Sequence, residues 1–536
     1  MIKDGKILIG KSGDEDIYIY PRMANRHGMI AGATGTGKTV TLKVMAEAFS
    51  NMGVPVFLAD VKGDLASLCE AGSASESVNS RIESMGLTDF TFQKFPVNFW
   101  DIYQEKGLPL RTTISEMGPL LLGRILDLND VQADVLTMIF KIADDEGKIL
   151  TDTKDLKAMV EYVNENRKDY GVTYGNMAQA TLAAITRAVI AIETEGAEKF
   201  FGEPALNVKD WLKTDYNGKG MIQVLDCQKL SLNPKMYSMF MLWMLSELFE
   251  LLPEVGDLEK PRIVFFFDEA HMLFETASKT LLEKIEQIVK LIRSRGVGIY
   301  FVTQNPKDIP DGVLAQLGNK VEHALHAYTP AEQKSAKAAA QGFRVNPEFD
   351  TYTVLQELGT GEALVSVLGE DGVPTIVKRA KILPPQSSLG TIGDETRKSI
   401  INNSDLYMTY HDSVDNYSAY EMLAERLTKV EAEVPATVTA AAAAVTGTET
   451  AVAEENLTAT QKKQKEIAEK KTTKSTLQKA TTKAVKNVAS TTVGTVGREL
   501  GKNLGSTIGG SFGKTLGGNV GSSIGRNLVG ILFSGK

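Results

Sequence analysis

The chain has 536 residues, of which 43% are hydrophobic and 24% charged, and its formal net charge is -8. This composition is typical of a globular protein with a large core, and it excludes a wholly disordered polypeptide. Lys and Arg outnumber Asp and Glu in residues 431–536, so the body of the protein is more acidic than the whole chain. An acidic body excludes indiscriminate coating of nucleic acid but permits DNA in a narrow basic channel.

The two cysteines and the N-terminal segment bear on the cellular compartment. Cys69 and Cys227 are far apart in sequence and form no CxxC pair, so we predict two buried thiols rather than a disulfide or zinc site. The segment "MIKDGKILIGKSGDED" lacks the apolar core of a signal peptide, and no run of about 18 uncharged apolar residues occurs. We therefore expect a cytoplasmic protein.

Short apolar runs alternate with helical patterns over the first 385 residues. The runs are "HGMIAGATG", "VPVFLADVKG", "GMIQVLDC", "RIVFFFDEA", "GIYFVTQNP" and "EHALHAY". Runs that are apolar on both faces are typical of buried parallel strands. The pattern predicts an α/β fold, a mainly parallel sheet with helices on both sides.

A phosphate-binding loop follows the first apolar run. The segment "GATGTGKT" fits the pattern GxxxxGK[ST] and precedes the predicted helix "KTVTLKVMAEAFSNMG". Its glycines let backbone N–H groups close around phosphate oxygens, while Lys38 reaches the β and γ phosphates and Thr39 offers a hydroxyl to Mg²⁺. The predicted nucleotide-binding residues are Gly32, Ala33, Thr34, Gly35, Thr36, Gly37, Lys38 and Thr39.

A helical insertion is predicted between the two halves of this core. The apolar period becomes helical over 108–212, in segments such as "NMAQATLAAITRAVIAIETEG". We therefore divide the core into residues 1–107, with the phosphate loop, and residues 213–385.

Two acids end the run "RIVFFFDEAH". Asp268 at the strand tip can hold Mg²⁺, and Glu269 can polarise the water that attacks ATP. Neighbouring side chains on an extended strand point to opposite faces, so both acids can serve one site only if the strand ends there. The pair predicts ATP hydrolysis; the alternative is an acidic pair that merely faces solvent.

The next segment offers an amide and two arginines. Gln304 follows the strand "GIYFVT", where it can bond the γ-phosphate or water and report hydrolysis, or merely cap the strand. Arg293 and Arg295 end the preceding helix, where they either complement the helix dipole or reach a neighbouring subunit's ATP as an arginine finger.

The last 150 residues are less regular. Residues 386–434 are predicted to be a partly helical extension, and the Ala-, Thr- and Lys-rich residues 435–492 a linker. In residues 493–536 a glycine recurs at every fourth position from Gly497 to Gly525, each after an apolar residue. Such a stripe predicts a glycine zipper that associates with itself or with a membrane surface; the alternative is a flexible tail.

Five segments together resemble a known family. They are "NRHGMIAGATGTGKTVTL", "FLADVKGDL", "FFFDEAHMLF", "RSRGVGIYFVTQNPKDIPDGVLAQLGNKVEHAL" and "GEALVSVLGEDGVP". Over about residues 1–385 the chain resembles the bacterial HerA-like ATPases with a helicase HerA-like C-terminal domain, in the HerA/FtsK group of motors. The resemblance implies a RecA-like P-loop core that forms a hexameric ring, hydrolyses ATP at subunit interfaces and moves DNA through its centre.

The resemblance also implies roles for single residues. By matching motif, Lys38 and Thr39 hold the phosphates and Mg²⁺, Asp268 binds the metal, Glu269 is the catalytic base and Gln304 is the sensor.

Four further residues match the family near the nucleotide. Arg26, just before the first strand, and Asp60, at the end of the second, match positions beside the nucleotide. The position of the arginine finger falls on Arg293 or Arg295, and the sequence does not choose between them.

The sequence also departs from the family. In archaeal HerA a β-barrel associated with a nuclease partner precedes the phosphate loop, whereas only about 30 residues precede Gly32 here. The sequence therefore gives no basis for expecting that nuclease partner. Nor does it contain a winged helix like the one that ends FtsK, so sequence-directed loading on DNA is not expected.

Two other functions compete with a DNA motor. "DEAH" at 268–271 occurs in DEAH-box RNA helicases, but here it lies much farther from the phosphate loop than in those enzymes. A ring ATPase that acts on protein or at the membrane, like the coupling ATPases of conjugation and secretion, remains open. Stimulation of ATP turnover by DNA distinguishes it from a DNA translocase.

Overall fold

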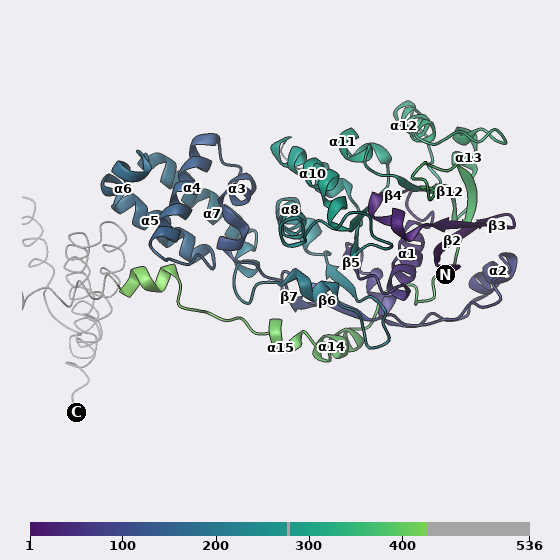
Figure 1. Ribbon diagram of the computed structural model, residues 1–536, viewed down its shortest axis with the longest axis horizontal. Coiled ribbons are helices and arrows are strands. Elements are labelled where there is room, and N and C mark those ends of the chain that lie inside the picture. The colour runs from purple at the N-terminus through teal and green to yellow at the C-terminus, as the bar shows by residue number, and fades with distance from the viewer. Residues whose placement is uncertain (276–278, 426–536) are drawn as a thin grey trace, which may run out of the picture. The chain divides into compact units, whose positions relative to one another are not determined.

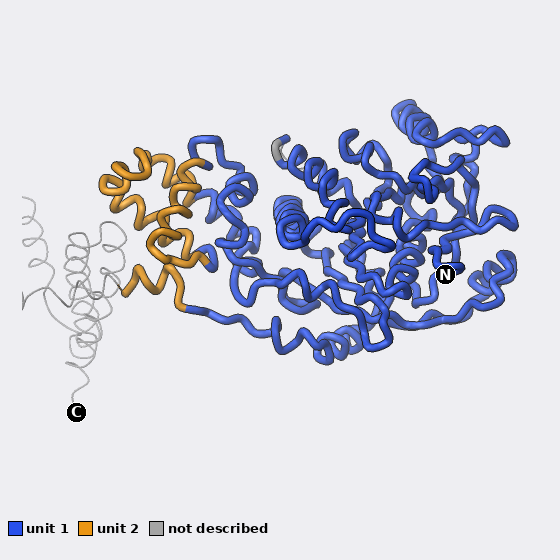
Figure 2. Tube along the Cα trace, viewed as in Figure 1, with its two compact units in different colours: residues 1–133, 151–153, 187–416 blue, residues 134–150, 154–186, 417–536 orange. Residues whose placement is uncertain are grey.

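Figure 1 shows a computed structural model of the chain, which describes residues 1–275 and 279–425. The predicted linker and glycine zipper, residues 435–536, lie outside the described residues, as does the extension beyond residue 425. The chain has two compact units (Figure 2). Unit 1 comprises residues 1–133, 151–153 and 187–416, and unit 2 comprises residues 134–150, 154–186 and 417–536.

Helices follow most of the parallel strands, and α3 to α7 succeed one another without an intervening strand. The helices are α1 (Lys38–Asn51), α2 (Glu76–Ser84), α3 (Ile114–Ile125), α4 (Asp130–Asp145), α5 (Thr153–Glu165), α6 (Arg167–Tyr174), α7 (Gln179–Thr194), α8 (Pro234–Leu251), α9 (His271–Glu275), α10 (Lys279–Ile292), α11 (Asp311–Leu314), α12 (Pro330–Gln341), α13 (Thr351–Glu357), α14 (Asp394–Asn402) and α15 (Tyr407–Tyr410). In the part of the chain that the structure describes, no helix is both long and apolar enough to cross a bilayer.

The strands of unit 1 form one 13-stranded sheet, most of it parallel. In spatial order the parallel strands are β11 (Asn319–Glu322), β4 (Gly28–Ala31), β10 (Val297–Thr303), β9 (Ile263–Phe267), β5 (Val56–Asp60), β8 (Ile222–Asp226), β6 (Val97–Asp101) and β7 (Leu108–Pro109). Nearly all residues of these strands are buried, and most of the strands are apolar on both faces, whereas β11 has the largely polar sequence NKVE. The predicted mainly parallel α/β fold is confirmed.

An antiparallel portion extends the sheet beyond β11. It consists of β12 (Glu362–Ser366), β13 (Lys378–Ile382), β2 (Lys6–Ser12), β1 (Ile2–Lys3) and β3 (Glu15–Ile19). The sequence did not predict these strands. In β13 only Ala380 and Ile382 are buried while the other three residues, Lys378, Arg379 and Lys381, carry charge, so the strand lacks an unbroken apolar run.

The predicted strand "EHALHAY" is wrong in its position. β11 comprises Asn319–Glu322 and ends where that run begins. His323 is buried and its ring bonds the Thr41 hydroxyl at 2.8 Å, while the Ala33 N–H donates to the Ala324 carbonyl at 2.9 Å. The chain therefore leaves the ladder to support the phosphate loop, a tertiary contact that an apolar pattern does not reveal.

Helices cover both faces of the parallel strands. Val56 and Leu58 of β5 share a core with residues of α1 such as Phe49. Phe57, between them in sequence, faces the other side, where its ring stacks 4.9 Å from Trp211 and lies 6.4 Å from Phe240 of α8. Figure 1 shows α1 and α8 on opposite sides of β5.

Residues 108–212, predicted as a helical insertion, carry α3 to α7 between β7 and β8. Their central part belongs to unit 2, which also contains the start of the segment after residue 416. Within unit 2 the Ser418 hydroxyl donates to Asp155 at 2.6 Å and the Ala419 N–H donates to the Ile149 carbonyl at 2.9 Å. Residues 417–425 thus complete the helical unit.

Truncation of Phe57 tests the packing of the sheet. The ring lies among Trp211, Phe240 and Phe265 and is fully buried. We expect Phe57→Ala to lower the free energy of unfolding by about 3–5 kcal/mol, because it leaves a cavity in the core. Urea denaturation measures the change. The control Leu120→Ala, at a side chain that is 65% exposed, should shift it by less than about 0.5 kcal/mol. Equal effects of the two variants would contradict this packing.

Candidate ATPase site

The phosphate loop joins β4 to α1. Gly32, Gly35 and Gly37 have φ angles of 145°, 81° and 119°, in a region that side chains with a Cβ rarely adopt. A Cβ on Gly32 would lie 2.5 Å from the Cβ of His323. The glycines are therefore needed both for the turn and for close packing, and they leave backbone N–H groups available to phosphate.

Lys38 is the first residue of α1 and its amine bends back over the loop. The Nζ atom donates to the carbonyls of Gly32 at 2.6 Å and Ala33 at 3.0 Å. Burial lowers the pKa of Lys38, and the nearby charge of Lys62 lowers it further. A bound phosphate would give this buried amine a counter-charge, so the side chain fits its predicted role.

The predicted catalytic acids lie just beyond β9, which ends at Phe267. Glu269 has a φ of 48°, so the strand does end there and both carboxylates lie at the same edge of the sheet. The Glu269 N–H donates to Asp268 Oδ1 at 3.0 Å. Burial raises the pKa of Asp268 to about 6, against the opposing charge of Lys62. The strand ends before the two acids, so both carboxylates can serve one site, as the sequence analysis requires.

The donor set fits a magnesium ion. Thr39 supplies a hydroxyl, and Asp268 supplies a buried carboxylate. Oδ1 of Asp268 accepts the hydrogen bond from the Glu269 N–H, so Oδ2 can bind a metal ion. Among the described residues no group of three or more His, Cys, Asp or Glu side chains could hold a metal alone. Mg²⁺ typically takes one or two protein oxygens and completes its shell with nucleotide phosphates and water.

A hydrogen-bonded network surrounds Glu269. Lys62 Nζ lies 2.6 Å from Oε1, and Gln304 Nε2 donates to Oε2 at 3.2 Å. The Thr34 hydroxyl donates to Gln304 Oε1 at 3.4 Å, and His271 Nδ1 lies 3.4 Å from Glu269 Oε2. Burial acts to raise the pKa of Glu269, but Lys62, Gln304 and His271 together outweigh burial and lower the pKa below its usual value. The predicted base is therefore ionised at neutral pH.

Sheet topology explains the position of Gln304. β10 lies between β4 and β9, with Thr303 opposite Ala31 and Phe301 opposite Phe267. The residue after Thr303 consequently lies between the phosphate loop and the catalytic acids. The structure thus brings the predicted sensor together with the predicted base.

Asp60 supports the neighbouring loop. Its Oδ1 accepts from the Gly63 N–H at 2.7 Å and its Oδ2 from the Ala66 N–H at 3.1 Å. Burial, with the nearby charge of Asp64, raises the pKa of Asp60 to about 7. The structure places Asp60 beneath the loop that carries Lys62, and its predicted contact with the nucleotide stays a prediction.

The three predicted arginines lie at the opposite edge of the sheet. Arg26 ends the 3-10 helix Pro21–Arg26 just before β4, and Arg293 and Arg295 lie just before β10. Because β4 and β10 are parallel, these residues are at the amino ends of strands whose carboxyl ends carry the site. A single chain therefore does not bring these arginines to its own phosphate loop.

Arg293 and Arg295 differ in their surroundings. The guanidinium of Arg295 donates to the Leu252 carbonyl, lies 3.7 Å from Glu254 and stacks 4.8 Å from the Phe249 ring centroid. Among the described residues none forms a hydrogen bond or ion pair with the guanidinium of Arg293. The guanidinium of Arg295 is therefore held by residues of its own chain, whereas that of Arg293 has no such hydrogen bond or ion pair among the described residues.

Sequence reasoning missed two residues of the site. His323 donates through Nδ1 to the Glu362 carbonyl at 2.8 Å, and burial lowers its pKa to about 4, so it is a neutral support for the loop. Lys62 lies in the segment "FLADVKGDL", which contributes to the family resemblance. Its position two residues after Asp60, where a predicted strand ends, was the signal that could have placed Lys62 at the site.

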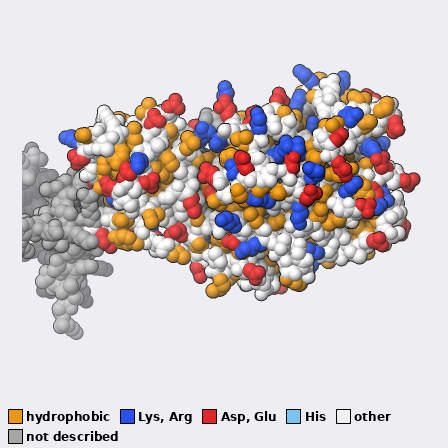
Figure 3. Space-filling model, in the orientation of Figure 1, with side chains coloured by type: hydrophobic (Ala, Val, Ile, Leu, Met, Phe, Trp, Pro, Cys, Tyr) orange, Lys and Arg blue, Asp and Glu red, His pale blue; other side chains and the backbone are white. Residues whose placement is uncertain are grey.

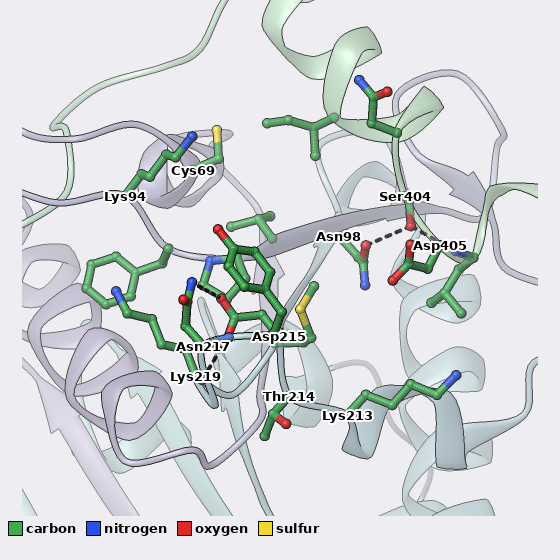
Figure 4. Close-up of a pocket in the computed structure, with 18 of the residues that line it drawn as sticks. Cys69, Lys94, Asn98, Lys213, Thr214, Asp215, Asn217, Lys219, Ser404 and Asp405 are labelled. Atoms are coloured by element: carbon green, nitrogen blue, oxygen red, sulfur yellow. Dashed lines mark hydrogen bonds between the residues drawn. The ribbon is translucent and has the colours of Figure 1, made fainter.

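A cavity of about 770 Å³ lies elsewhere, near the amino ends of β6 and β8 (Figure 4). Its lining includes Lys94, Asp215 and the Asn98 side chain, which accepts from Ser404 at 2.8 Å. Cys69 also lines it; this thiol and Cys227 are free and buried, as predicted. No nucleotide motif of the sequence lies in this lining, so cavity size does not mark the ATPase site.

Comparison with known proteins decides the family. The family described as "Helicase HerA-like C-terminal" matches residues 6–514, which extends well beyond the resemblance over residues 1–385. The chain belongs to this family. Together with the phosphate loop and catalytic acids, this membership shows that the HerA-like chain is a P-loop ATPase.

Individual relatives are more distant. The chain is 24% identical over 388 residues to the DNA double-strand break repair helicase HerA of Sulfurisphaera tokodaii, covering 70% of each protein. It is 23% identical over 398 residues to the protein of the same name from Sulfolobus acidocaldarius, covering 70% of this chain and 68% of the relative.

Among solved structures, the bacterial conjugative coupling protein TrwB matches 72% of this chain and 92% of its own, with a TM-score of 0.46 and 13% identity. VirB4 of Thermoanaerobacter pseudethanolicus matches 71% and 97%, with a TM-score of 0.43 and 16% identity. At these scores neither likeness supports a functional argument.

Two substitutions separate nucleotide binding from turnover. Lys38→Ala should abolish ATP binding because it removes the amine held over the loop. Glu269→Gln should keep ATP bound but lower turnover by about 100-fold or more, because it removes the carboxylate that polarises water. Binding of a fluorescent ATP analogue and phosphate release measure the two effects. The exposed Glu259→Gln serves as control; normal turnover by Glu269→Gln would contradict the assignment of the base.

Proposed function

We propose that this ATPase works as a hexameric ring that hydrolyses Mg²⁺-bound ATP at its subunit interfaces and moves DNA through its centre. The supporting observation is the division of the site between two edges of the sheet. Lys38, Glu269 and Gln304 are at the carboxyl edge, whereas the arginines are at the amino edge. A second subunit can bring its amino edge against this site and complete it.

We assign the arginine finger to Arg293. Its guanidinium lacks a hydrogen-bonding partner among the described residues, while Arg295 is held by Leu252 and Glu254 of its own chain. Burial and the nearby Arg26 lower the pKa of Arg293, so an anion such as a neighbour's γ-phosphate would relieve the repulsion between the two arginines. An arginine in this position stabilises charge that develops during phosphoryl transfer.

DNA is the substrate that best fits the family. The two HerA relatives described above are named DNA double-strand break repair helicases, which supports DNA over protein as the substrate. On the face drawn in Figure 3, basic and acidic side chains are interspersed over the described residues. Such a face favours contact with DNA in a restricted channel over binding across the whole surface.

Mixed rings test the shared interface. Arg293→Ala and Lys38→Ala should each abolish turnover alone, because each removes one half of every site. A random equal mixture should recover up to about a quarter of the normal rate, since about one interface in four pairs two intact groups. Phosphate release from co-purified mixed rings measures recovery. Arg295→Ala should keep turnover within about threefold, and failure of mixed rings to recover any activity would refute the role in trans.

Addition of DNA tests the substrate. We expect ATP turnover to rise at least about tenfold with DNA, and the stimulation to weaken as salt screens phosphate contacts. A steady-state ATPase assay with and without single- and double-stranded DNA measures the effect. Lack of stimulation by either would instead support an ATPase that acts on protein or at the membrane.

A further inference from the structure

The carboxylate of Glu269, the predicted catalytic base, forms an ion pair with Lys62. Lys62 Nζ lies 2.6 Å from Glu269 Oε1, and the two side chains are 41% and 7% exposed. The lysine thus reaches from the solvent side to a buried acid. Gln304 Nε2 donates to the other oxygen at 3.2 Å, with His271 Nδ1 at 3.4 Å from the same atom. Both oxygens of Glu269 are therefore engaged by protein groups rather than free for an attacking water.

The backbone that carries Lys62 is fixed. Asp60 accepts hydrogen bonds from the N–H groups of Gly63 and Ala66, and Gln228 Nε2 donates to the Lys62 carbonyl at 2.9 Å. A Cβ on Gly63, whose φ is 82°, would lie 2.2 Å from Gln228 Nε2, so the loop also packs closely. The flexible lysine side chain can consequently leave Glu269 without movement of the loop.

Lys62 differs in this respect from Lys38. The amine of Lys38 is buried and bonds the carbonyls of Gly32 and Ala33 in the phosphate loop. It is already placed to serve the nucleotide. Lys62 instead contacts the base and is accessible from solvent, so a phosphate oxyanion outside the nucleotide pocket can compete with Glu269 for it.

We infer that Lys62 is a positioning residue that restrains Glu269 in the resting enzyme, and that DNA raises ATP turnover by drawing Lys62 away through a backbone phosphate. Release frees Oε1 of Glu269 to accept a hydrogen bond from the attacking water. The identity of the releasing ligand rests on the proposed DNA function. The restraint itself rests on the contact between Lys62 and Glu269.

The test compares Lys62→Met with the wild type in the full-length protein. Methionine keeps an unbranched side chain but removes the cation. Without DNA, kcat should rise about fivefold, which corresponds to the loss of roughly 1 kcal/mol of restraint. The KM for ATP should stay within about twofold, and the DNA-stimulated rate should stay near that of the wild type. The ratio of stimulated to basal rate therefore falls.

Three further variants serve as controls for Lys62→Met. Lys62→Arg keeps a cation at the same place and should restore the low basal rate. Lys229→Met removes another half-exposed lysine paired with a carboxylate, Glu105, and should leave the basal rate unchanged. Lys62→Met combined with Glu269→Gln should lack turnover, because the extra basal activity passes through Glu269.

Other outcomes overturn the inference. A fall of kcat in Lys62→Met, with and without DNA, would show that Lys62 aids the reaction rather than restrains the base. An unchanged basal rate would show that the ion pair has no effect on turnover. If the wild type does not respond to DNA but Lys62→Met still gains basal activity, the restraint holds and only the proposed DNA substrate fails.

Discussion

The structure depends on four parallel strands whose carboxyl ends meet at one edge of a sheet that is buried on both faces. β4 delivers the phosphate loop, β9 the two acids, β10 the sensor, and β5 the loop with Lys62. The register between neighbouring strands determines which of these groups meet, and a slip of one residue would turn every apolar side chain to the other face. The same parallel order places the arginines at the amino edge, which is why we propose that a second chain completes the site.

Charges at this edge are paired or hydrogen-bonded with one another and with the loop. Glu269 is paired with Lys62, and Lys38 is turned onto the carbonyls of its own loop. Buried charged groups are stable only when they are paired or hydrogen-bonded, so these contacts offset the cost of burying charge at this edge. A phosphate oxyanion can compete for either amine, which makes Lys38, Lys62 and Glu269 sensitive to what is bound.

Much of the site could be predicted because its signals are local in sequence. An unbroken apolar run ending in glycine or an acid predicts a buried strand with its functional group, as in β4 and β9. The strands β12 and β13 were not predicted, because apolar and charged residues alternate in β13 and because both strands pair with distant segments, β12 with β11 and β13 with β2. Nor could the sequence predict the course of the chain after Glu322 or the ion pair of Glu269. Both depend on contacts between segments more than 200 residues apart.

The most direct test of a site divided between subunits is an electron cryo-microscopy structure of the Glu269→Gln protein with ATP and Mg²⁺. We expect a ring in which each γ-phosphate lies between Lys38 and Gln304 of one subunit and Arg293 of the next, with Mg²⁺ on Thr39 and Asp268. A nucleotide enclosed by residues of one chain alone, with Arg293 far from every phosphate, would contradict it.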